Sequence, residues 1–529
     1  MKKLIILIFA FSFALAAGSQ EMPEHILKLM YTSNIITRFY VDDADNGKIT
    51  EAGIKAMLKE LDPHSTYSDP KETKALLEQM QGSFSGIGIQ FNIMSDTLYV
   101  IQTTKNGPSE RAGVLAGDKI IAVNDTVIAG VKMERADIMS RLRGTKGSEV
   151  KITVKRKGIN RDIEFNLVRD DISTETVDVA YMIDNKNGYI RITSFGAKTH
   201  EEFVTRLDSL KSLGMKNLIL DLEGNGGGYL TAAVDIASEF IDEESLIVYT
   251  EGKSSPRYEY RSKGEGRFRK GNLVVMIDET SASASEILSG AIQDWDRGIV
   301  VGRRSFGKGL VQRPFNLPDG SMIRLTIARY YTPTGRCIQK PYDNDSIKYE
   351  EDLMHRYNHG ELSSADSIHF PDSLKTYTKR LGRPVYGGGG IMPDFFVPID
   401  TLKYTKYHRA LASKGCIIQA SLKYLDANRE RLTKEYSDIN DFDERFDVDE
   451  DFIEILRSQA EMDSVKLEGG EEEFRKSLPQ IKRQLKHLIA RDLWDMSDFM
   501  RIYNRTNDVF IKAYELVKDK KFEKLMIKQ

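Results

Sequence analysis

The sequence predicts a multidomain α/β protein. A helical N-terminal segment and a β-rich module with two helices come first, followed by an α/β core and a helical C-terminal extension. The chain has 529 residues, more than one ordinary hydrophobic core accommodates. Residues 172–400 alternate buried strands with amphipathic helices, a pattern typical of α/β sheets. Apolar residues make up 40% and charged residues 29%, as in folded soluble domains.

Residues 1–18 have the pattern of a secretory signal peptide. Lys2 and Lys3 precede an uncharged run of fourteen residues from Leu4 to Ala17, which ends in small residues. A membrane-spanning helix needs roughly 20 apolar residues, so an uncleaved membrane anchor is the less favoured alternative. We therefore predict an exported protein, located in the periplasm or else membrane-associated or extracellular.

Charge and cysteine content argue against several classes of protein. A formal net charge of −3 gives no electrostatic basis for binding nucleic acid. The only cysteines are Cys337 and Cys416, which allow one disulfide but no disulfide framework. Histidines and cysteines nowhere have the spacing of a zinc site, and we predict neither a metal nor an organic cofactor.

Residues 22–80 form the predicted helical N-terminal region. Apolar residues recur at helical spacing from Ile26 to Phe39 and from Ile54 to Leu61. His64 follows the second run, and a histidine at a helix end is more often structural than catalytic.

Residues 82–170 form the β-rich module. Ser85-Gly-Ile-Gly-Ile-Gln-Phe91 combines a glycine loop with the start of a strand. Further strands are expected at 97–102 and 150–156, with a helix at 133–142 between them.

The α/β core is predicted to span residues 172–400. The expected elements are strands at 188–195, 217–222 and 273–278 and helices at 201–213 and 230–240. The polar residues 341–382 predict an insertion in this core. Four consecutive glycines, Gly387–Gly390, predict a flexible turn.

Residues 401–529 predict a helical C-terminal extension. Asp438–Asp451 is rich in acidic residues, which favours a solvated face or a linker. Residues 474–526 have the periodicity of two or three amphipathic helices. This pattern fits packing against the core and a role in dimerisation or docking equally well, so a homo-oligomer is one expectation.

A serine-rich motif, Ser281-Ala-Ser-Ala-Ser-Glu-Ile, lies at a predicted strand-to-helix turn. Ser283 and Glu286 have the Ser-x-x-Glu spacing of a capping box. Free N–H groups and the positive end of the helix dipole surround such a serine, which suits stabilisation of an oxyanion. An ordinary helix cap is the competing interpretation.

A lysine motif follows the serine motif. Lys308 lies between Gly307 and Gly309, 25 residues after Ser283, and Gln312 comes four residues later. An offset of four keeps two side chains on one side of the backbone, so Gln312 can reach the lysine amine. A glycine-flanked lysine is usually part of a solvated turn. Serine, lysine and amide close together would instead form a nucleophilic Ser–Lys dyad.

The combination of Ser281-Ala-Ser-Ala-Ser-Glu and Phe306-Gly-Lys-Gly-x-x-Gln resembles the C-terminal processing peptidases, also called tail-specific proteases. The resemblance covers roughly residues 25–400. It implies that Ser283 is the nucleophile, that Lys308 is its base and that Gln312 orients the lysine amine.

A glycine-rich turn, Asp221-Leu-x-Gly-Asn-x-Gly-Gly, also resembles this family. The resemblance implies an oxyanion hole made by the N–H of Ala284 and the N–H of Gly227 or Gly228. Glu223 departs from the family, which usually has an arginine at this position, so the local tether of the turn is expected to differ.

Residues 107–124 resemble the middle of a PDZ domain, with a short helix that leads into a Gly-Asp turn and a strand. PDZ domains bind extended peptide ends beside an exposed strand. The resemblance implies that the backbone of Gly86, Ile87, Gly88 and Ile89 holds a peptide carboxylate. A PDZ-like spacer or lid without a ligand is the alternative.

These resemblances, together with the signal-peptide pattern, imply an exported serine endopeptidase that cleaves protein substrates near or from their C-terminus, with the PDZ module recognising the tail and gating activity. One alternative is a non-catalytic PDZ adaptor, in which Lys308 would be exposed with an ordinary pKa. Another is a Ser–Lys acyl hydrolase acting on a non-peptide substrate. A Ser–His–Asp protease is less favoured, because no histidine lies between His200 and His355.

Overall fold

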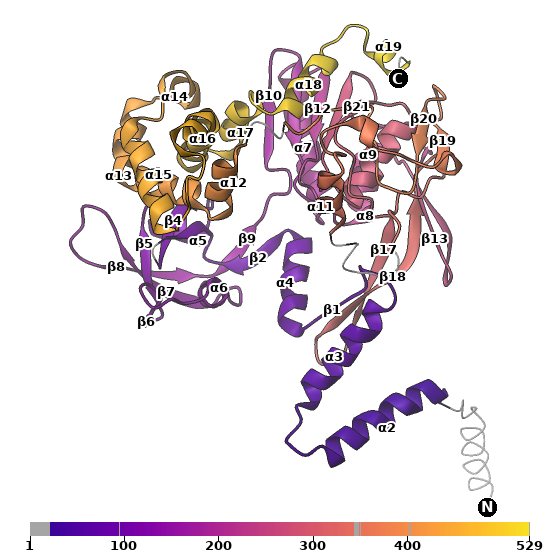
Figure 1. The fold of residues 1–529 in the computed structure, drawn as a ribbon, viewed down its shortest axis with the longest axis horizontal. Helices are drawn as coiled ribbons and strands as arrows, with labels where there is room; N and C mark the ends of the chain where they lie inside the picture. The colour runs from indigo at the N-terminus through magenta and orange to yellow at the C-terminus, as the bar shows by residue number, and fades with distance from the viewer. Residues whose placement is uncertain (1–21, 95, 343–348, 350, 401–403, 528–529) are drawn as a thin grey trace, which may run out of the picture.

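The computed structural model describes residues 22–94, 96–342, 349, 351–400 and 404–527. The predicted signal peptide, 1–18, and part of the predicted insertion lie outside these residues. Figure 1 shows an α/β core with the helical extension beside it, the β-rich module beneath that extension, and helix α2 projecting from the lower end. The predicted fold class is confirmed. Within the described residues, no helix is both long and apolar enough to cross a lipid bilayer.

The N-terminal region is helical. Its elements are α2 (Glu24–Phe39), α3 (Asn46–Lys59), β1 (Thr66–Ser68) and α4 (Pro70–Gln81). None of the α2 residues is buried, although the helix carries apolar side chains such as Phe39. The apolar periodicity of this segment therefore correctly predicts the helix, but the side chains that create it do not contribute to the core of this chain.

The β-rich module has one antiparallel sheet with two helices. The sheet order is β3 (Ile89–Met94), β4 (Thr97–Thr103), β5 (Lys119–Val123), β7 (Glu149–Lys155) and β8 (Ile163–Val168), with β6 (Thr126–Val127) paired to β5. The helices are α5 (Pro108–Ala112) and α6 (Arg135–Leu142), and the pair β2 (Ser83–Gly86) and β9 (Asp170–Ser173) connects the module to the core. Leu98, Ile120 and Ile152 are buried in its own hydrophobic core.

The core is built on a six-stranded sheet. Its order is β10 (Val179–Met182), β11 (Asn187–Arg191), β12 (Asn217–Asp221), β15 (Leu273–Ile277), β16 (Ile299–Gly302) and β21 (Phe395–Phe396). The strands from β11 to β21 are parallel, and β10 is antiparallel to β11. Parallel strands that are buried on both faces read as continuous apolar runs, as in Leu273–Ile277.

Helices cover both faces of this sheet. On one face lie α7 (Thr199–Ser212), α8 (Leu230–Ser238) and α9 (Ala284–Asp294); on the other lie α17 (Met496–Asn504) and α18 (Asp508–Val517). Successive residues of β12 alternate between the two layers, because Leu218 and Leu220 pack with α7–α9 whereas Ile219 packs with α18. The end of the chain thus packs against the core, one of the two possibilities left open by the sequence. Dimerisation remains a prediction.

A second sheet joins the N-terminal region to the core. Its order is β1, β18 (Met322–Tyr331), β13 (Leu246–Gly252) and β14 (Ser255–Arg261), and β17 (Leu310–Asn316) also pairs with β18. Because β1 pairs with β18, residues 62–68 lie next to the hairpin that follows Lys308.

The rest of the extension is a helical bundle with its own core. It comprises α12 (Lys406–Ser413), α13 (Cys416–Glu435), α14 (Ile439–Arg445), α15 (Glu450–Met462) and α16 (Gly470–Leu493). The short α19 (Phe522–Ile527) follows α18 and packs with it against the core sheet. The alternative of a linker at Asp438–Asp451 is wrong, because the segment contains α14, on which Phe442 is fully buried. The alternative of a solvated face is confirmed, because acidic residues such as Glu444 and Asp447 are exposed. Asp438 and Asp449 also accept hydrogen bonds from the first N–H groups of α14 and α15.

The glycine run Gly387–Gly390 is packed rather than flexible. It follows α11 (Asp352–Asn358), β19 (Lys375–Tyr377) and β20 (Pro384–Tyr386). A Cβ at Gly390 would lie 2.6 Å from the Ser305 carbonyl oxygen, so the run allows close backbone approach. Cys337 and Cys416 are both free and form no disulfide.

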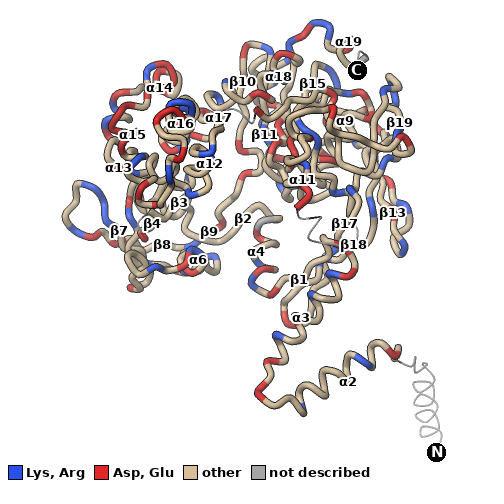
Figure 2. Tube along the Cα trace, viewed as in Figure 1, with Lys and Arg blue, Asp and Glu red and all other residues tan. Residues whose placement is uncertain are grey.

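Charged residues of both signs are interspersed over all parts of the described chain (Figure 2). The β-rich module contacts the extension through such residues. Lys119 on β5 lies 3.4 Å from the Asp426 carboxylate on α13, and Lys157 donates to the Asp426 carbonyl at 3.1 Å.

Candidate active site

The serine motif, the lysine motif and the glycine-rich turn meet at one edge of the core sheet. The glycine-rich turn follows β12, the serine motif follows β15 and the lysine motif follows β16. These strands are adjacent and parallel, so their carboxyl ends share an edge, where ligands of open α/β sheets bind.

Ser283 lies in a constrained turn at the start of α9. It is half-buried and has a φ of 56°, a left-handed conformation that non-glycine residues rarely adopt. Its N–H donates to Glu286 Oε2 at 2.8 Å. Ahead of it, the Ser281 hydroxyl donates to the Leu222 carbonyl at 2.7 Å, which ties the turn to the end of β12. An uncommon backbone conformation held by such contacts is frequent at functional sites.

Glu286 joins the serine and lysine motifs. Its Oε2 accepts from the N–H groups of Ser283 at 2.8 Å and Lys308 at 2.9 Å, and its Oε1 accepts from Ser305 Oγ at 2.5 Å and Gly307 N–H at 2.7 Å. Burial raises the pKa of this fully buried carboxyl, whereas the four donors favour its charged form. The sequence indicated Glu286 only as a capping residue. The apolar residues next to it in the predicted helix were the signal that could have predicted its burial.

Lys308 and Gln312 are in contact as their spacing predicts. Lys308 Nζ donates to Gln312 Oε1 at 3.0 Å. Burial, and then the positive charge of Arg324, lowers the pKa of Lys308 from its ordinary value. Among the described residues, Lys308 Nζ makes no hydrogen bond to the Ser283 hydroxyl. The Tyr330 hydroxyl lies 2.6 Å from the Lys308 carbonyl oxygen and 3.1 Å from that of Ser283, so it can donate to either.

His64 supports Gln312 from the N-terminal region. Its carbonyl accepts a hydrogen bond from Gln312 Nε2, and its Nε2 lies 2.6 Å from the Tyr349 hydroxyl. Burial and the nearby Lys308 lower the pKa of His64 to about 4, which leaves the ring neutral at neutral pH. These contacts are those of a structural histidine.

The glycine-rich turn packs directly against Ser283. A Cβ at Gly227 would lie 2.7 Å from Ser283 Cβ, and the φ of Gly227 is 101°, so only glycine fits here. The Gly227 N–H donates to Asn225 Oδ1 at 2.8 Å. The N–H groups of Gly228 and Ala284, by contrast, find no acceptor among the described residues. Two unengaged donors therefore lie next to this contact.

Further bonds lock the turn to the serine motif. The Asn225 carbonyl accepts from the Ala282 N–H at 3.0 Å and from the Ser285 hydroxyl at 2.8 Å. The Gly224 N–H donates to Asp278 Oδ2 at 3.0 Å. Movement of the glycine-rich turn is thus coupled to the position of the serine motif.

Residues 86–89 form a loop in the β-rich module. The Ile87 carbonyl accepts from the Ser109 N–H at 3.0 Å and from its hydroxyl at 2.7 Å, and the Gly88 carbonyl accepts from the Thr104 N–H. The N–H groups of Ile87 and Gly88 have no acceptor among the described residues. Gly86 ends β2 and Ile89 begins β3, so the loop lies at the start of an edge strand.

Comparisons with known proteins place these motifs in a family. Residues 186–347 match Peptidase family S41, residues 85–167 match the PDZ domain, and residues 407–495 match a family of unknown function (DUF8443). The carboxy-terminal processing protease CtpA of Bacillus subtilis (strain 168) is 35% identical over 339 residues, which cover 64% of this chain and 69% of that protein. The chain belongs to the carboxy-terminal processing proteases.

The chain is also similar to other processing proteases. The carboxy-terminal-processing protease of Bartonella bacilliformis is 31% identical over 332 residues, 62% of this chain and 76% of that protein. A solved photosystem II D1 C-terminal processing protease is 27% identical, with a TM-score of 0.34, and the match covers 60% of this chain and 90% of that one. As a carboxy-terminal processing protease, the chain is a member of a family of serine proteases with a PDZ domain.

Proposed function

We propose that this protein is an exported endopeptidase in which Ser283 and Lys308 form a catalytic dyad that cleaves protein substrates near or from their C-terminus. The observation that carries the proposal is the environment of Lys308, whose amine is half-buried, bonded to Gln312 and shifted towards the neutral form by burial. A PDZ adaptor without catalytic activity would have no need for such a lysine.

In this mechanism, the neutral Lys308 amine takes the proton of the Ser283 hydroxyl as its oxygen attacks the scissile carbonyl. The protonated amine then delivers a proton to the leaving peptide amine, and water hydrolyses the acyl-enzyme by the same route in reverse. Gln312 Oε1 accepts from Lys308 Nζ and so aims the amine without adding charge. Neither a metal nor an organic cofactor takes part in these steps.

Backbone donors would stabilise the oxyanion of the tetrahedral intermediate. The Ala284 N–H is at the start of α9, where the helix dipole favours negative charge. Of the two glycines, Gly228 is the better candidate, because the Gly227 N–H is engaged by Asn225. Each such donor contributes roughly 3–4 kcal/mol to transition-state stabilisation.

The PDZ domain would bind the C-terminal tail of the substrate. The tail would add as a strand beside β3, which is an edge of the PDZ sheet, with its carboxylate at the Ile87 and Gly88 N–H groups. Arg135 of α6 now lies over the Phe91 ring of β3, 4.7 Å from its centroid, and would have to make room for a bound tail.

Tail binding would gate the dyad. Ser283 and Lys308 are not hydrogen-bonded to each other, an arrangement that suits a resting enzyme, and catalytic hydrogen bonds often tighten only with substrate. The PDZ domain joins the core through the β2–β9 pair, and tail binding would act on the core through this connection.

The test compares wild type, Ser283→Ala and Lys308→Ala on an unstructured protein with an apolar C-terminal tail. Cleavage by the wild type alone supports the dyad. Equal cleavage by all three proteins overturns it.

The same substrate with its terminal carboxylate amidated tests the PDZ domain, since equal rates with and without the free carboxylate contradict tail recognition. N-terminal sequencing of protein from a periplasmic fraction tests export and removal of residues 1–18.

A further inference from the structure

The glycine-rich turn has a partner far away in the sequence. Glu223 opens this turn directly after β12, and its Oε2 accepts a hydrogen bond from Asn507 Nδ2 at 2.9 Å. Asn507 lies between α17 and α18, beyond residues 407–495 that match the family of unknown function.

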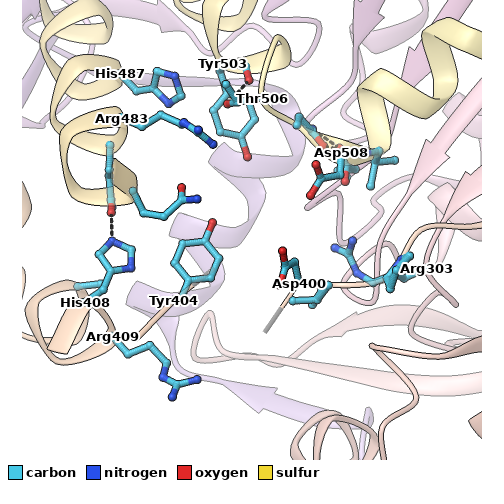
Figure 3. A pocket seen from close by; sticks show the side chains of 18 residues that line it. Arg303, Asp400, Tyr404, His408, Arg409, Arg483, His487, Tyr503, Thr506 and Asp508 are labelled. Atoms are coloured by element: carbon cyan, nitrogen blue, oxygen red, sulfur yellow. Dashed lines mark hydrogen bonds between the residues drawn. The ribbon is translucent and has the colours of Figure 1, made fainter. Parts of the chain in front are cut away.

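The Glu223–Asn507 contact lies at the junction between the core and the extension. Both residues line a cavity of about 510 Å³ there. Figure 3 shows His408, Arg483 and His487 on one side of this cavity and Arg303, Asp400 and Asp508 on the other. The Glu223 carboxyl is therefore close to solvent-accessible space but is itself only partly exposed.

A carboxylate is costly at this position without a donor. Burial, and then the adjacent Asp221 carboxylate, raises the pKa of Glu223. Asp278 acts in the same direction from the end of β15, whereas Arg303 after β16 opposes it, and Tyr503 of α17 also faces the group. The Asn507 amide supplies a donor without adding charge.

Asn507 is itself fixed by α18. Its Oδ1 accepts from the N–H groups of Val509 at 3.0 Å and Phe510 at 3.4 Å, as a helix N-cap. With the oxygen of the amide used for the cap, the nitrogen is directed at Glu223. Helix α18 packs against the sheet, so the donor is held by a rigid element.

The contact continues to the catalytic serine. The Glu223 N–H donates to Asp221 Oδ1 at 2.8 Å, and the next residue, Gly224, is bonded to Asp278. Asn225 and Gly227 then contact the serine motif as described above. A displacement of Glu223 would therefore move the backbone that carries Gly228.

We propose that Glu223 and Asn507 are positioning residues that hold the oxyanion turn, and that the C-terminal extension is thereby part of the catalytic unit. This inference rests on the proposed function of the turn. It assigns a role in catalysis to the end of the chain.

The test exchanges the carboxylate and the amide group between the two side chains in the full-length protein. Asn507→Asp keeps the α18 cap but places a carboxylate opposite Glu223. Glu223→Gln/Asn507→Asp restores a donor–acceptor pair in reversed order. Asn440→Asp, at an exposed residue of α14 that does not line the cavity with Glu223, makes the same chemical change and serves as control.

We expect kcat on a fluorogenic peptide to fall about 10- to 100-fold for Asn507→Asp, because small displacements at a reacting centre cost up to 10²-fold. KM should change less than about threefold. The loss should deepen as pH rises, since the two carboxylates then lose a shared proton. The double variant should recover kcat to within about threefold of wild type.

The inference is overturned by an Asn507→Asp enzyme with wild-type kcat, or by a double variant as slow as the single one at equal thermal stability. Failure of the proposed function gives a different result, because Ser283→Ala would then retain the wild-type rate. If the Asn440→Asp control lost kcat to the same extent as Asn507→Asp, the loss would be due to the added negative charge, and the positioning role of Glu223 and Asn507 would likewise be overturned.

Discussion

At the scale of single residues, Glu286 determines the geometry of the site. One buried carboxylate accepts four hydrogen bonds, two at each of its oxygens, and so fixes the serine and lysine backbones relative to each other. The spacing of 25 residues between Ser283 and Lys308 is long enough for a helix, a strand and a turn. Glu286 then brings the two ends of that segment together.

Glu286→Gln should reduce activity and stability together. The amide retains one oxygen but directs an NH₂ group at the donors that the other oxygen served, so at least one backbone N–H loses its acceptor. We expect kcat to fall at least 10-fold and the free energy of unfolding by about 2–3 kcal/mol. Denaturant unfolding and peptide kinetics measure both. Glu201→Gln, on the exposed first turn of α7, is the control and should change neither.

Lys308 should control the pH dependence of activity. Its pKa is lowered by burial, so the neutral base accumulates as pH rises and kcat/KM should increase with an inflection below the ordinary lysine value of 10.5. Lys308→Arg should be inactive throughout, because a guanidinium stays protonated. A pH–rate profile from pH 6 to 10 checks this. An inflection near 6.5 that persists in Lys308→Arg would indicate a histidine base instead.

At the scale of elements, parallel strand pairing assembles the site. The turns after β12, β15 and β16 converge because adjacent parallel strands end at one edge, and the β17–β18 hairpin then directs Gln312 back to Lys308. The glycine-rich turn approaches the serine so closely that side-chain volume there is excluded.

Gly227→Ala should inactivate the enzyme far more strongly than Gly224→Ala. Both glycines have positive φ, 101° and 74°, so both substitutions strain the backbone. Only at Gly227 does the new Cβ meet Ser283, at 2.7 Å, whereas nothing lies within 4 Å of a Cβ at Gly224. We expect kcat losses of about 100-fold and about threefold, respectively. Equal losses would show that backbone strain alone accounts for the effect.

At the scale of the whole molecule, the N-terminal region and the C-terminal extension both contribute elements to the sheets of the core. Helices α17 and α18 form the second layer of the core sheet, and β1 from the N-terminal region extends the second sheet. The PDZ domain is held against α13 by Lys119 and Lys157, through partly exposed contacts that are individually weak. Such contacts suit a domain that changes position when a tail binds.

Phe510→Ala should destabilise the core and not only the extension. Phe510 on α18 is 7% exposed, and its ring contacts the Tyr189 ring of β11 at 5.6 Å between centroids. We expect the free energy of unfolding to fall by about 3–5 kcal/mol. The neighbouring Ile511 is 41% exposed, so Ile511→Ala should cost less than about 1 kcal/mol. Similar losses for both variants in urea unfolding would contradict a joint core.

Much of the fold could be predicted from the sequence, because strands and helices follow from the spacing of apolar residues. The strand at 273–278 and the helices at 201–213 and 230–240 appear as β15, α7 and α8 with small shifts of their ends. The contact between Lys308 and Gln312 was also predictable, since it spans four residues. The catalytic roles of these residues remain proposals.

Only the tertiary structure decided which distant segments meet. The Glu223–Asn507 bond joins positions 284 residues apart, and Gly390 packs against Ser305, which is likewise far from it in the sequence. Local periodicity carries no information on such pairings, because it fixes which face of an element is apolar but not what covers that face. The sequence by itself determined the helices, the strands and contacts between residues close in sequence, such as Lys308 and Gln312. The packing of the N-terminal region and the C-terminal extension against the core determined the surroundings of the site.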